Sequence, residues 1–152
     1  MLGQLPLMVH FDNCLVGQVW HGRSFTLIEK DIIQFAKQWD PQPFHADPEL
    51  AKNSFYGGIT APSAYLFCIA SKLFNEISEF SGIGALKHEF EIASPAMTGD
   101  QLTFKLTCIE KRASKSKSDR GLVKFELTLT TQNNDIVLKQ YSTIMLYRKI
   151  ND

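Results

Sequence analysis

The densest group of polar side chains that could do chemistry lies at residues 39–48, in the run Trp-Asp-Pro-Gln-Pro-Phe-His-Ala-Asp-Pro. It holds a carboxylate, Asp40, and an imidazole, His45. Pro41 and Pro43 stiffen the backbone between them, because each proline fixes its own φ and restricts the residue before it. A pair held in this way can orient one water, with Asp40 taking its proton and His45 holding the water or donating to a substrate. The spacing alone also fits an Asp that caps a helix and a His in the loop between two helices.

The wider segment, residues 40–48, resembles the Asp-x-Asn-Pro-x-His-x-Asp-Pro signature of the MaoC-like dehydratases, a family that includes the (R)-specific enoyl-CoA hydratases. The resemblance implies the hot-dog fold, in which an antiparallel sheet wraps a long central helix, over residues 1–152 as one domain. Other segments that are similar to the family cover most of the chain, at residues 10–12, 16–18, 26–36, 55–63, 94–100 and 114–121.

The resemblance also implies roles for single residues. Asp40 and His45 take the positions of the family's catalytic dyad. Ser63 takes the place of a Gly whose backbone N–H forms the oxyanion hole, and Ser71 that of a Ser that hydrogen-bonds the catalytic Asp. The implied reaction is the reversible hydration of trans-2-enoyl-CoA to (R)-3-hydroxyacyl-CoA. Asp40 would activate the water that attacks C3, a proton would return to C2 by way of His45, and the N–H donor would stabilise the enolate-like thioester oxygen.

Three positions depart from the family pattern. Gln42 stands where the motif has Asn, which adds one methylene to a supporting side chain beside the dyad. Trp39 stands where a Gly is common, and Pro62-Ser63 stands where His-Gly or Ser-Gly is usual. Both members of the dyad are retained, so the sequence predicts an active enzyme whose substrate is less well defined than its reaction.

Two further groups have both a structural and a functional interpretation. Residues 111–120 carry five positive charges against one negative charge. This segment is either a solvated hairpin loop or a site where Lys115 and Lys117 bind the phosphates of coenzyme A. In the second case the coenzyme could be bound across a dimer interface. Tyr65 is either a core residue or part of an acyl tunnel. His88 alternates with apolar residues, which is typical of a half-buried His in a strand.

The first half of the chain has helical patterns. Thr26 and Glu29 have the spacing of a capping box, which predicts a helix that ends at the prolines after Trp39. Asp47 followed by Pro48 predicts the start of a shorter helix. A third helix is expected after residue 60, with Thr60 as its N-cap. Apolar residues cover much of the circumference of this third helix, which predicts a buried position: Leu66, Phe67, Ala70, Leu73, Phe74 and Ile77.

The second half of the chain changes to a period of two. Apolar residues alternate at residues 86–92, 102–108 and 123–129, a last run covers 136–147, and turn-like sequences separate the runs. Four hairpin-linked strands after one buried helix predict an antiparallel sheet curled around that helix, which is an α+β fold. A strand near residues 17–25 should join the sheet.

The composition is that of an ordinary globular protein, with 44% hydrophobic and 21% charged residues in a chain of 152. Sixteen basic and sixteen acidic side chains balance, so no global charge attracts the chain to nucleic acid. The longest apolar run, residues 64–70, is far shorter than the about 20 residues of a membrane span. We therefore expect a protein that binds neither nucleic acid nor membranes.

Cysteine usage favours a reducing compartment. Cys14, Cys68 and Cys108 are odd in number and widely spaced, so free thiols in a cytoplasmic protein are expected. Cys68, on the apolar helix, is expected to be a packing residue. No His, Cys or acidic cluster has the spacing of a metal site. Coenzyme A is part of the implied substrate, so no separate cofactor is expected.

Two other functions compete with the hydratase interpretation. A hot-dog thioesterase would need a carboxylate beside a hydrolytic water on the central helix, and Glu76 and Glu79 lie near the end of that helix. A non-catalytic acyl-CoA-binding subunit would have a damaged dyad, whereas Asp40 and His45 are both present. The implied partner is an acyl-CoA thioester. The resemblance also implies at least a homodimer, because hot-dog sheets typically pair edge to edge and bring the acyl pocket to the interface.

Overall fold

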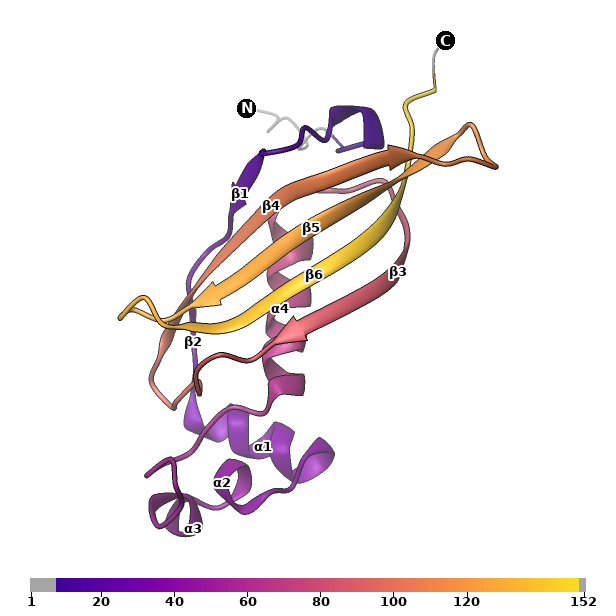
Figure 1. The fold of residues 1–152 in the computed structure, drawn as a ribbon. Coiled ribbons are helices and arrows are strands. Elements are labelled where there is room, and N and C mark those ends of the chain that lie inside the picture. The colour runs from indigo at the N-terminus through magenta and orange to yellow at the C-terminus, as the bar shows by residue number, and fades with distance from the viewer. Residues whose placement is uncertain (1–7, 151–152) are drawn as a thin grey trace, which may run out of the picture.

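The computed structural model describes residues 8–150. A curved antiparallel sheet wraps one long helix, α4 (Ser63–Ile77), and three short helices lie together beyond one end of the sheet (Figure 1). The strands are β1 (Val19–His21), β2 (Phe25–Thr26), β3 (Gly82–Glu91), β4 (Gln101–Ala113), β5 (Arg120–Thr130) and β6 (Ile136–Tyr147). Their order is β1-β4-β5-β6-β3, with β2 also paired to β4. The predicted α+β hot-dog architecture is confirmed.

The sheet follows from the alternation in its sequence. In β5 every second side chain is buried, and in β4 the buried series includes Leu102, Phe104 and Leu106. Strands with one apolar face gain free energy by burying it, here against α4. The single strand expected near residues 17–25 is instead two short strands, β1 and β2, on the β4 side of the sheet. Within residues 8–150, no helix has both the length and the apolar character needed to cross a membrane.

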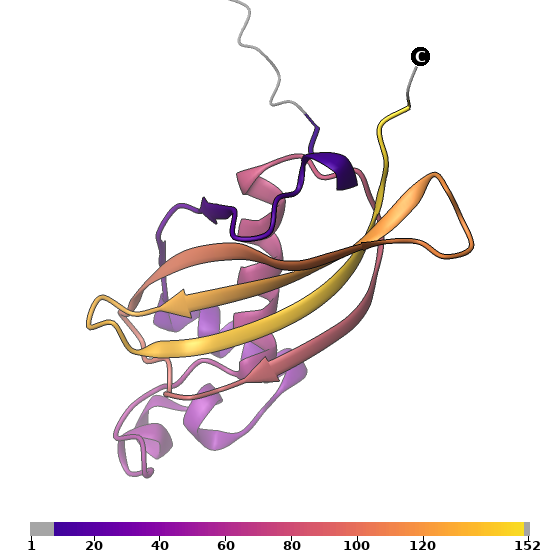
Figure 2. The same cartoon turned by 45° about the horizontal axis from the view of Figure 1, so that its top comes forward.

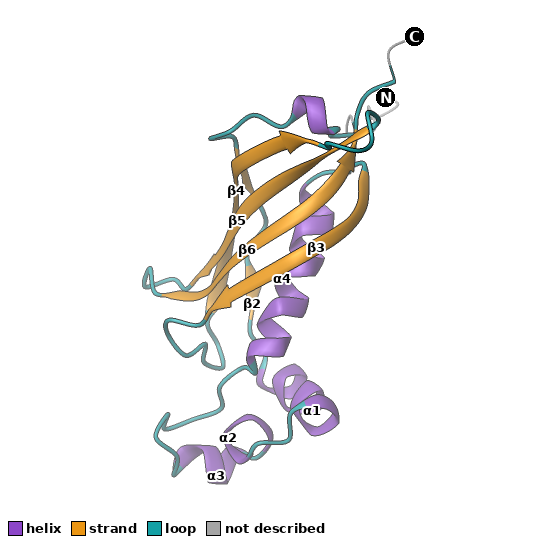
Figure 3. Cartoon of the chain, turned by 45° about the vertical axis from the view of Figure 1, so that its right-hand side comes forward, coloured by secondary structure: helices purple, strands orange, loops and turns teal. Residues whose placement is uncertain are grey.

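One face of α4 forms the core contact. Leu66, Ile69, Ala70 and Leu73 are buried, whereas Cys68 is exposed. The expectation that Cys68 is a packing residue is therefore wrong for the single chain. The apolar residues of the helix are not all covered, because the sheet curls over one side only (Figure 3). The opposite side of α4 remains open next to β3.

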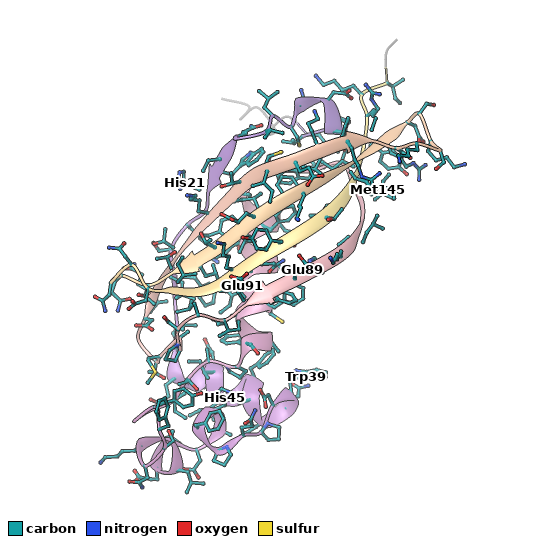
Figure 4. The ribbon with its side chains drawn as sticks, viewed as in Figure 1. His21, Trp39, His45, Glu89, Glu91 and Met145 are labelled. Carbon is teal, nitrogen blue, oxygen red and sulfur yellow. The ribbon has the colours of Figure 1, made fainter. Side chains whose placement is uncertain are left out.

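The three short helices are α1 (Glu29–Trp39), α2 (Pro43–Ala46) and α3 (Pro48–Lys52), and together we call them the overhang. Asp47 caps α3 as predicted, since its side chain accepts hydrogen bonds from the N–H groups of Glu49 and Leu50 at 3.0 and 3.1 Å. Trp39, the last residue of α1, is 67% exposed and projects outward from the overhang (Figure 4).

Two predicted caps are wrong. Thr26 lies in β2, and α1 follows Ile28 without a side-chain cap, because the chain at Leu27 is held extended by two backbone hydrogen bonds to the turn at Gly99–Asp100. Thr60 is not the N-cap of α4 either. Its backbone pairs with Phe44 and Met97, so the helix begins later, after Pro62.

Candidate active site

Asp40 is positioned by the end of α1. Its backbone N–H donates to the Ala36 carbonyl at 2.9 Å, and Pro41 then prevents the helix from continuing. Asp40 is thus a C-terminal cap and not an N-terminal one. Gln42 supports its carboxylate, because the side-chain Nε2 of Gln42 donates to Asp40 Oδ1 at 3.1 Å. The predicted supporting residue Gln42 therefore does contact the candidate base.

His45 comes from α2, a helical turn that the sequence indicated only as a stiff bend. The side chain is buried, and its Nδ1 lies 2.6 Å from the carbonyl oxygen of Thr60 and 3.0 Å from the Thr60 hydroxyl. The carbonyl can only accept, so Nδ1 carries the proton and donates it there. The ring is therefore fixed in orientation and in tautomer, with Nε2 as its free nitrogen.

The free nitrogen of His45 faces Asp40. Nε2 lies 3.7 Å from Asp40 Oδ2, which is too long for a direct hydrogen bond but short enough for one water to touch both. In neutral His45 both atoms are acceptors, so they are complementary to the two protons of a water molecule. The sequence prediction that Asp40 and His45 form a pair thus agrees with their separation in the structure.

The backbone N–H of Ser63 is available near this pair. Ser63 is the first residue of α4, and a first-turn amide has no acceptor within its helix. Ser63 follows Thr60, which contacts the His45 ring, by three positions. The Cα atoms of Ser63 and Thr60 are therefore at most about 11 Å apart. Pro62 precedes it with φ −57° and ψ 143°, so the chain enters the helix in a fixed direction. The positive end of the α4 dipole favours negative charge at this amide.

An open groove runs along α4 beside β3, and we call it the α4–β3 groove. Its part near the overhang is lined by Ser63, Phe67 and Phe90 among others. It continues through Phe67 and His88 into a cavity of about 370 Å³, whose walls include Ser71 and Phe74. A mostly apolar groove that leads away from a helix N-terminus is suited to an acyl chain whose carbonyl lies at that terminus.

Ser71 is not beside Asp40 of its own chain, and Tyr65 packs against the core, the first of its two expected places. Ser71 lies two helical turns from Ser63, about 12 Å along α4, and within residues 8–150 it forms no hydrogen bond to Asp40. It lines the groove instead. Tyr65 points to α1, where its ring lies 4.9 Å from that of Phe35, and burial raises the pKa of its phenol. Tyr65 is not among the side chains that line the groove in the described part of the chain.

The basic loop is far from the dyad of its own chain. Lys115 and Lys117 lie in the hairpin between β4 and β5, which projects at the end of the sheet opposite the overhang (Figure 2). Two of the other basic side chains in this region are already engaged: Lys111 Nζ donates to the Phe11 and Cys14 carbonyls, and Arg120 pairs with Asp119. Lys115 and Lys117 are therefore not part of the group formed by Asp40 and His45 within one chain.

Glu76, considered above for a thioesterase, is held in an ion pair. Arg23 Nε lies 2.7 Å from Glu76 Oε2, and the hydrogen bond from Arg23 lowers the pKa of the Glu76 carboxyl. Lys72 is a second cationic neighbour at 3.5 Å. The carboxylate is thereby occupied in joining the loop before β2 to the end of α4.

Sequence reasoning missed two features of the site. The role of Thr60 depends on a contact between residues 15 positions apart, which no local pattern reveals. The other feature is a polar cluster of His88, Gln140 and Ser142 in the groove wall. Its signal was present, because Gln140 and Ser142 occupy inward positions of β6 between Leu138 and Ile144.

Comparison with known proteins gives one family. The model of the family described as "FAS1-like, dehydratase domain region" matches residues 14–140. Among curated proteins, the chain is similar to the uncharacterized protein YdeM of Bacillus subtilis (strain 168), with 24% identity over 140 residues that cover 90% of this chain and 98% of YdeM.

Solved structures share the fold. A MaoC-like dehydratase from Rhodospirillum rubrum has a TM-score of 0.87 and 25% identity, and the match covers 94% of this chain and 99% of that one. The R-hydratase PhaJ1 from Pseudomonas aeruginosa has a TM-score of 0.71 and 19% identity, over 95% of this chain and 93% of that one.

Proposed function

This chain belongs to the family of FAS1-like dehydratase domain regions, a MaoC-like dehydratase family, and we propose that it hydrates trans-2-enoyl-CoA to (R)-3-hydroxyacyl-CoA and catalyses the reverse dehydration. The carbonyl of the thioester accepts a hydrogen bond from the Ser63 amide. The acyl chain lies in the α4–β3 groove. Similarity to the R-hydratase PhaJ1 supports the choice of this reaction within the family.

In the proposed reaction Asp40 and His45 act on one water. The water donates to Asp40 Oδ2 and His45 Nε2, which directs its oxygen lone pair toward C3 of the substrate. As the C3–O bond forms, a carboxylate oxygen or Nε2 takes a proton, and the double-bond electrons move toward the thioester oxygen. That proton then reaches C2 from Nε2, directly if Nε2 took it or after transfer from the Asp40 carboxyl to Nε2, so that one water is added across C2 and C3. The Ser63 N–H stabilises the enolate-like oxygen in between.

The fixed tautomer of His45 is the observation that carries the proposal. A backbone carbonyl at 2.6 Å holds the Nδ1 proton, so Nε2 is the only nitrogen that can exchange a proton with substrate. A buried His that served packing alone would need no free nitrogen directed at a carboxylate 3.7 Å away.

We further propose that the chain works as a homodimer through β3. This strand is at the edge of the sheet, and all ten of its residues are exposed, including Ile83, Leu86 and Phe90. A long exposed edge strand with apolar side chains is a liability in a monomer and a ready surface for pairing. Antiparallel pairing of two β3 strands satisfies their free backbone groups and closes the open side of the groove.

Such a pair would also supply the contacts that one chain lacks. The Glu91 end of β3 lies near the overhang and the Gly82 end near the C-terminal half of α4, as Figures 1 and 3 show. Antiparallel pairing therefore brings the overhang of one copy to the end of the groove that contains Ser71 in the other. The hairpin with Lys115 and Lys117 lies at that same end (Figure 2), so both residues would serve the dyad of the second copy.

The test is an incubation of the purified protein with crotonyl-CoA, with two products measured in parallel. We expect the ultraviolet absorbance of the conjugated double bond to fall, and we expect no release of free thiol. Release of free CoA at the same rate would identify a thioesterase. Tight binding of crotonyl-CoA without change in either signal would identify a non-catalytic binding subunit.

A further inference from the structure

Three polar side chains from the sheet interrupt the apolar wall of the α4–β3 groove. Gln140 and Ser142 are each only 5% exposed and point inward from β6, where Leu138 and Leu146 are buried core residues. His88 lies opposite Ser142 in the register of β3 with β6, so it shares the same face of the sheet. None of the three is used by the proposed chemistry at Asp40 and His45.

Hydrogen bonds link the three side chains into one cluster. Gln140 Nε2 donates to Ser142 Oγ at 2.8 Å, and Ser142 Oγ lies 2.8 Å from His88 Nδ1. Because Ser142 accepts from Gln140, its own proton is free for His88 Nδ1. Nδ1 is then an acceptor, so the proton of neutral His88 is on Nε2. The rings of Phe67 and Phe90 lie at 5.3 and 6.0 Å from the His88 ring and hold it at the groove.

The Gln140 end of this hydrogen-bonded cluster has an unpaired group. Gln140 Oε1 is buried and has no hydrogen-bond partner among residues 8–150. If the amide is turned by half a rotation, its oxygen faces Ser142 and its NH₂ group is unpaired instead. A buried amide without a partner is costly, so either orientation asks for a polar group from outside the protein. A hydroxyl satisfies both orientations, because it can donate and accept.

The cluster is well placed along a bound acyl chain. His88 contacts Phe67, which lies four residues from both Ser63 and Ser71 on α4. Along α4, the cluster is therefore about 6 Å from the Ser63 end of the groove and about 6 Å from the Ser71 end. A thioester could enter the groove at either end. The surrounding walls are mostly apolar and include Phe74, Leu127 and Ile144, with Ser71 on the α4 side.

We propose that the His88–Ser142–Gln140 cluster selects acyl chains that carry a hydroxyl group about 6 Å from the thioester carbonyl, within the groove of the proposed hydratase, on which this inference rests. In the first amide orientation the hydroxyl donates to the Gln140 oxygen and receives the Nε2–H of His88. In the turned orientation it accepts from the Gln140 NH₂ group and donates to His88 Nε2. A chain without that hydroxyl leaves the amide unpaired when it excludes water from the groove.

The pantetheine arm of coenzyme A fits the cluster less well. Pantetheine carries amide groups along its whole length, and each of them would need a partner. Most of the cavity wall is apolar, with Ser71 and Asn75 of α4 as the polar residues outside the cluster, which suits an aliphatic chain with few polar substituents.

The experiment compares two saturated thioesters of equal size by titration calorimetry with the full chain: 6-hydroxyhexanoyl-CoA and heptanoyl-CoA, which has a methyl group in place of the hydroxyl. We expect the hydroxylated ligand to bind about tenfold more tightly, the equivalent of one well-formed hydrogen bond. Analogues with the hydroxyl one carbon nearer to or farther from the thioester locate the contact. Free CoA, as a third ligand, reports on the coenzyme alone.

Gln140→Met keeps the size of the side chain and removes its polar atoms, and Ser142→Ala removes one oxygen. Both should bring the two affinities to within about twofold of each other without changing the affinity for free CoA. Thr143→Ala, on the outward face of the same strand, is the matched control and should retain the full preference. Thermal melting shows whether each variant is folded.

Equal binding of all hydroxylated and apolar ligands by the wild-type protein would overturn the proposal and leave the cluster as a site for water only. A preference that survives in both Gln140→Met and Ser142→Ala would overturn it as well. Calorimetry needs no turnover, so a failure of the hydratase assay and a failure of this preference are separate results.

Discussion

At the scale of single residues, the start of α4 offers an unusually clean test of the oxyanion site. Ser63 is the first helical residue, where proline is tolerated because its missing N–H has no partner in the helix. Pro62 already has the extended conformation that precedes a proline, with ψ 143°. Ser63→Pro therefore removes one N–H donor with little cost to folding.

We expect Ser63→Pro to lower kcat for enoyl-CoA hydration by about 10²–10³, the usual cost of deleting one oxyanion donor. Ser63→Ala retains the N–H and should keep activity within about threefold. Steady-state kinetics and thermal melting of both variants decide the question. If Ser63→Ala were as inactive as Ser63→Pro, the hydroxyl and not the backbone would be the working group.

The cysteines give a second residue-scale prediction. Burial, with the nearby Cys108 thiol as a smaller cause, raises the pKa of Cys14 from 9.0 to about 11, and burial also raises the pKa of Cys108. Since the thiolate is the reactive form, both should be nearly inert to a disulfide reagent at pH 8, whereas exposed Cys68 should react at once.

Counting the thiols that react before and after unfolding checks this prediction. One fast thiol in the native protein, absent in Cys68→Ser, is the expected result, and three fast native thiols would contradict the burial of Cys14. The sign of the pH effect follows from the same shift. The folded state keeps its proton to a higher pH than the unfolded state, so stability should fall as pH rises from about 9 to about 11.

At the scale of elements, β3 is the segment whose environment is least complete in one chain. Leu86 is 58% exposed in this strand, and we expect Leu86→Glu to convert a dimer into a monomer, because two copies of the new charge would meet at the paired edge. Light scattering after size exclusion measures the mass.

Leu15→Glu, just before β1 at the opposite edge of the sheet and 64% exposed, is the matched control and should remain dimeric. The Leu86→Glu monomer should also lose hydratase activity, since the proposed site needs a second copy. A wild-type protein that is monomeric and fully active would contradict the role given to β3.

The hairpin between β4 and β5 is the other element whose proposed role depends on the dimer. Replacing Lys115 and Lys117 with Glu should raise KM for CoA thioesters and leave kcat nearly unchanged, because the contact is to the coenzyme in ground and transition state alike. The increase in KM should shrink at high salt, which screens exposed charges. A KM that does not change at low salt would make this segment a plain solvated loop.

At the scale of the whole molecule, periodicity in the sequence predicted most of the fold. Apolar residues two positions apart, such as Leu102 and Phe104, define strands whose buried face has few alternatives, and the helix at Leu66–Leu73 was equally clear. The helix starts were wrong at Thr26 and Thr60. In both cases a distant turn, at Gly99 or Met97, holds the chain extended, and a local capping signal does not contain that contact.

The part of the site that lies within one segment was predictable, and the part that depends on distant residues was not. Asp40, Gln42 and His45 lie within one short segment, so their pairing could be inferred from a motif. The tautomer of His45 depends on Thr60, from a different part of the chain. In the proposed dimer, Ser71 meets the overhang of the second copy, and no pattern within one chain describes such a contact.

The measurement that tests the central claim most directly is the hydration of crotonyl-CoA by the wild-type protein, Asp40→Asn and His45→Ala, with chiral analysis of the product. Positioned acid–base groups contribute about 10²–10⁴ in rate, so each variant should lose at least about a hundredfold while keeping the melting behaviour of the wild type. The wild-type product should be (R)-3-hydroxybutyryl-CoA. A folded Asp40→Asn variant that hydrates crotonyl-CoA at nearly the wild-type rate would contradict the assignment of Asp40 and His45 as the catalytic pair.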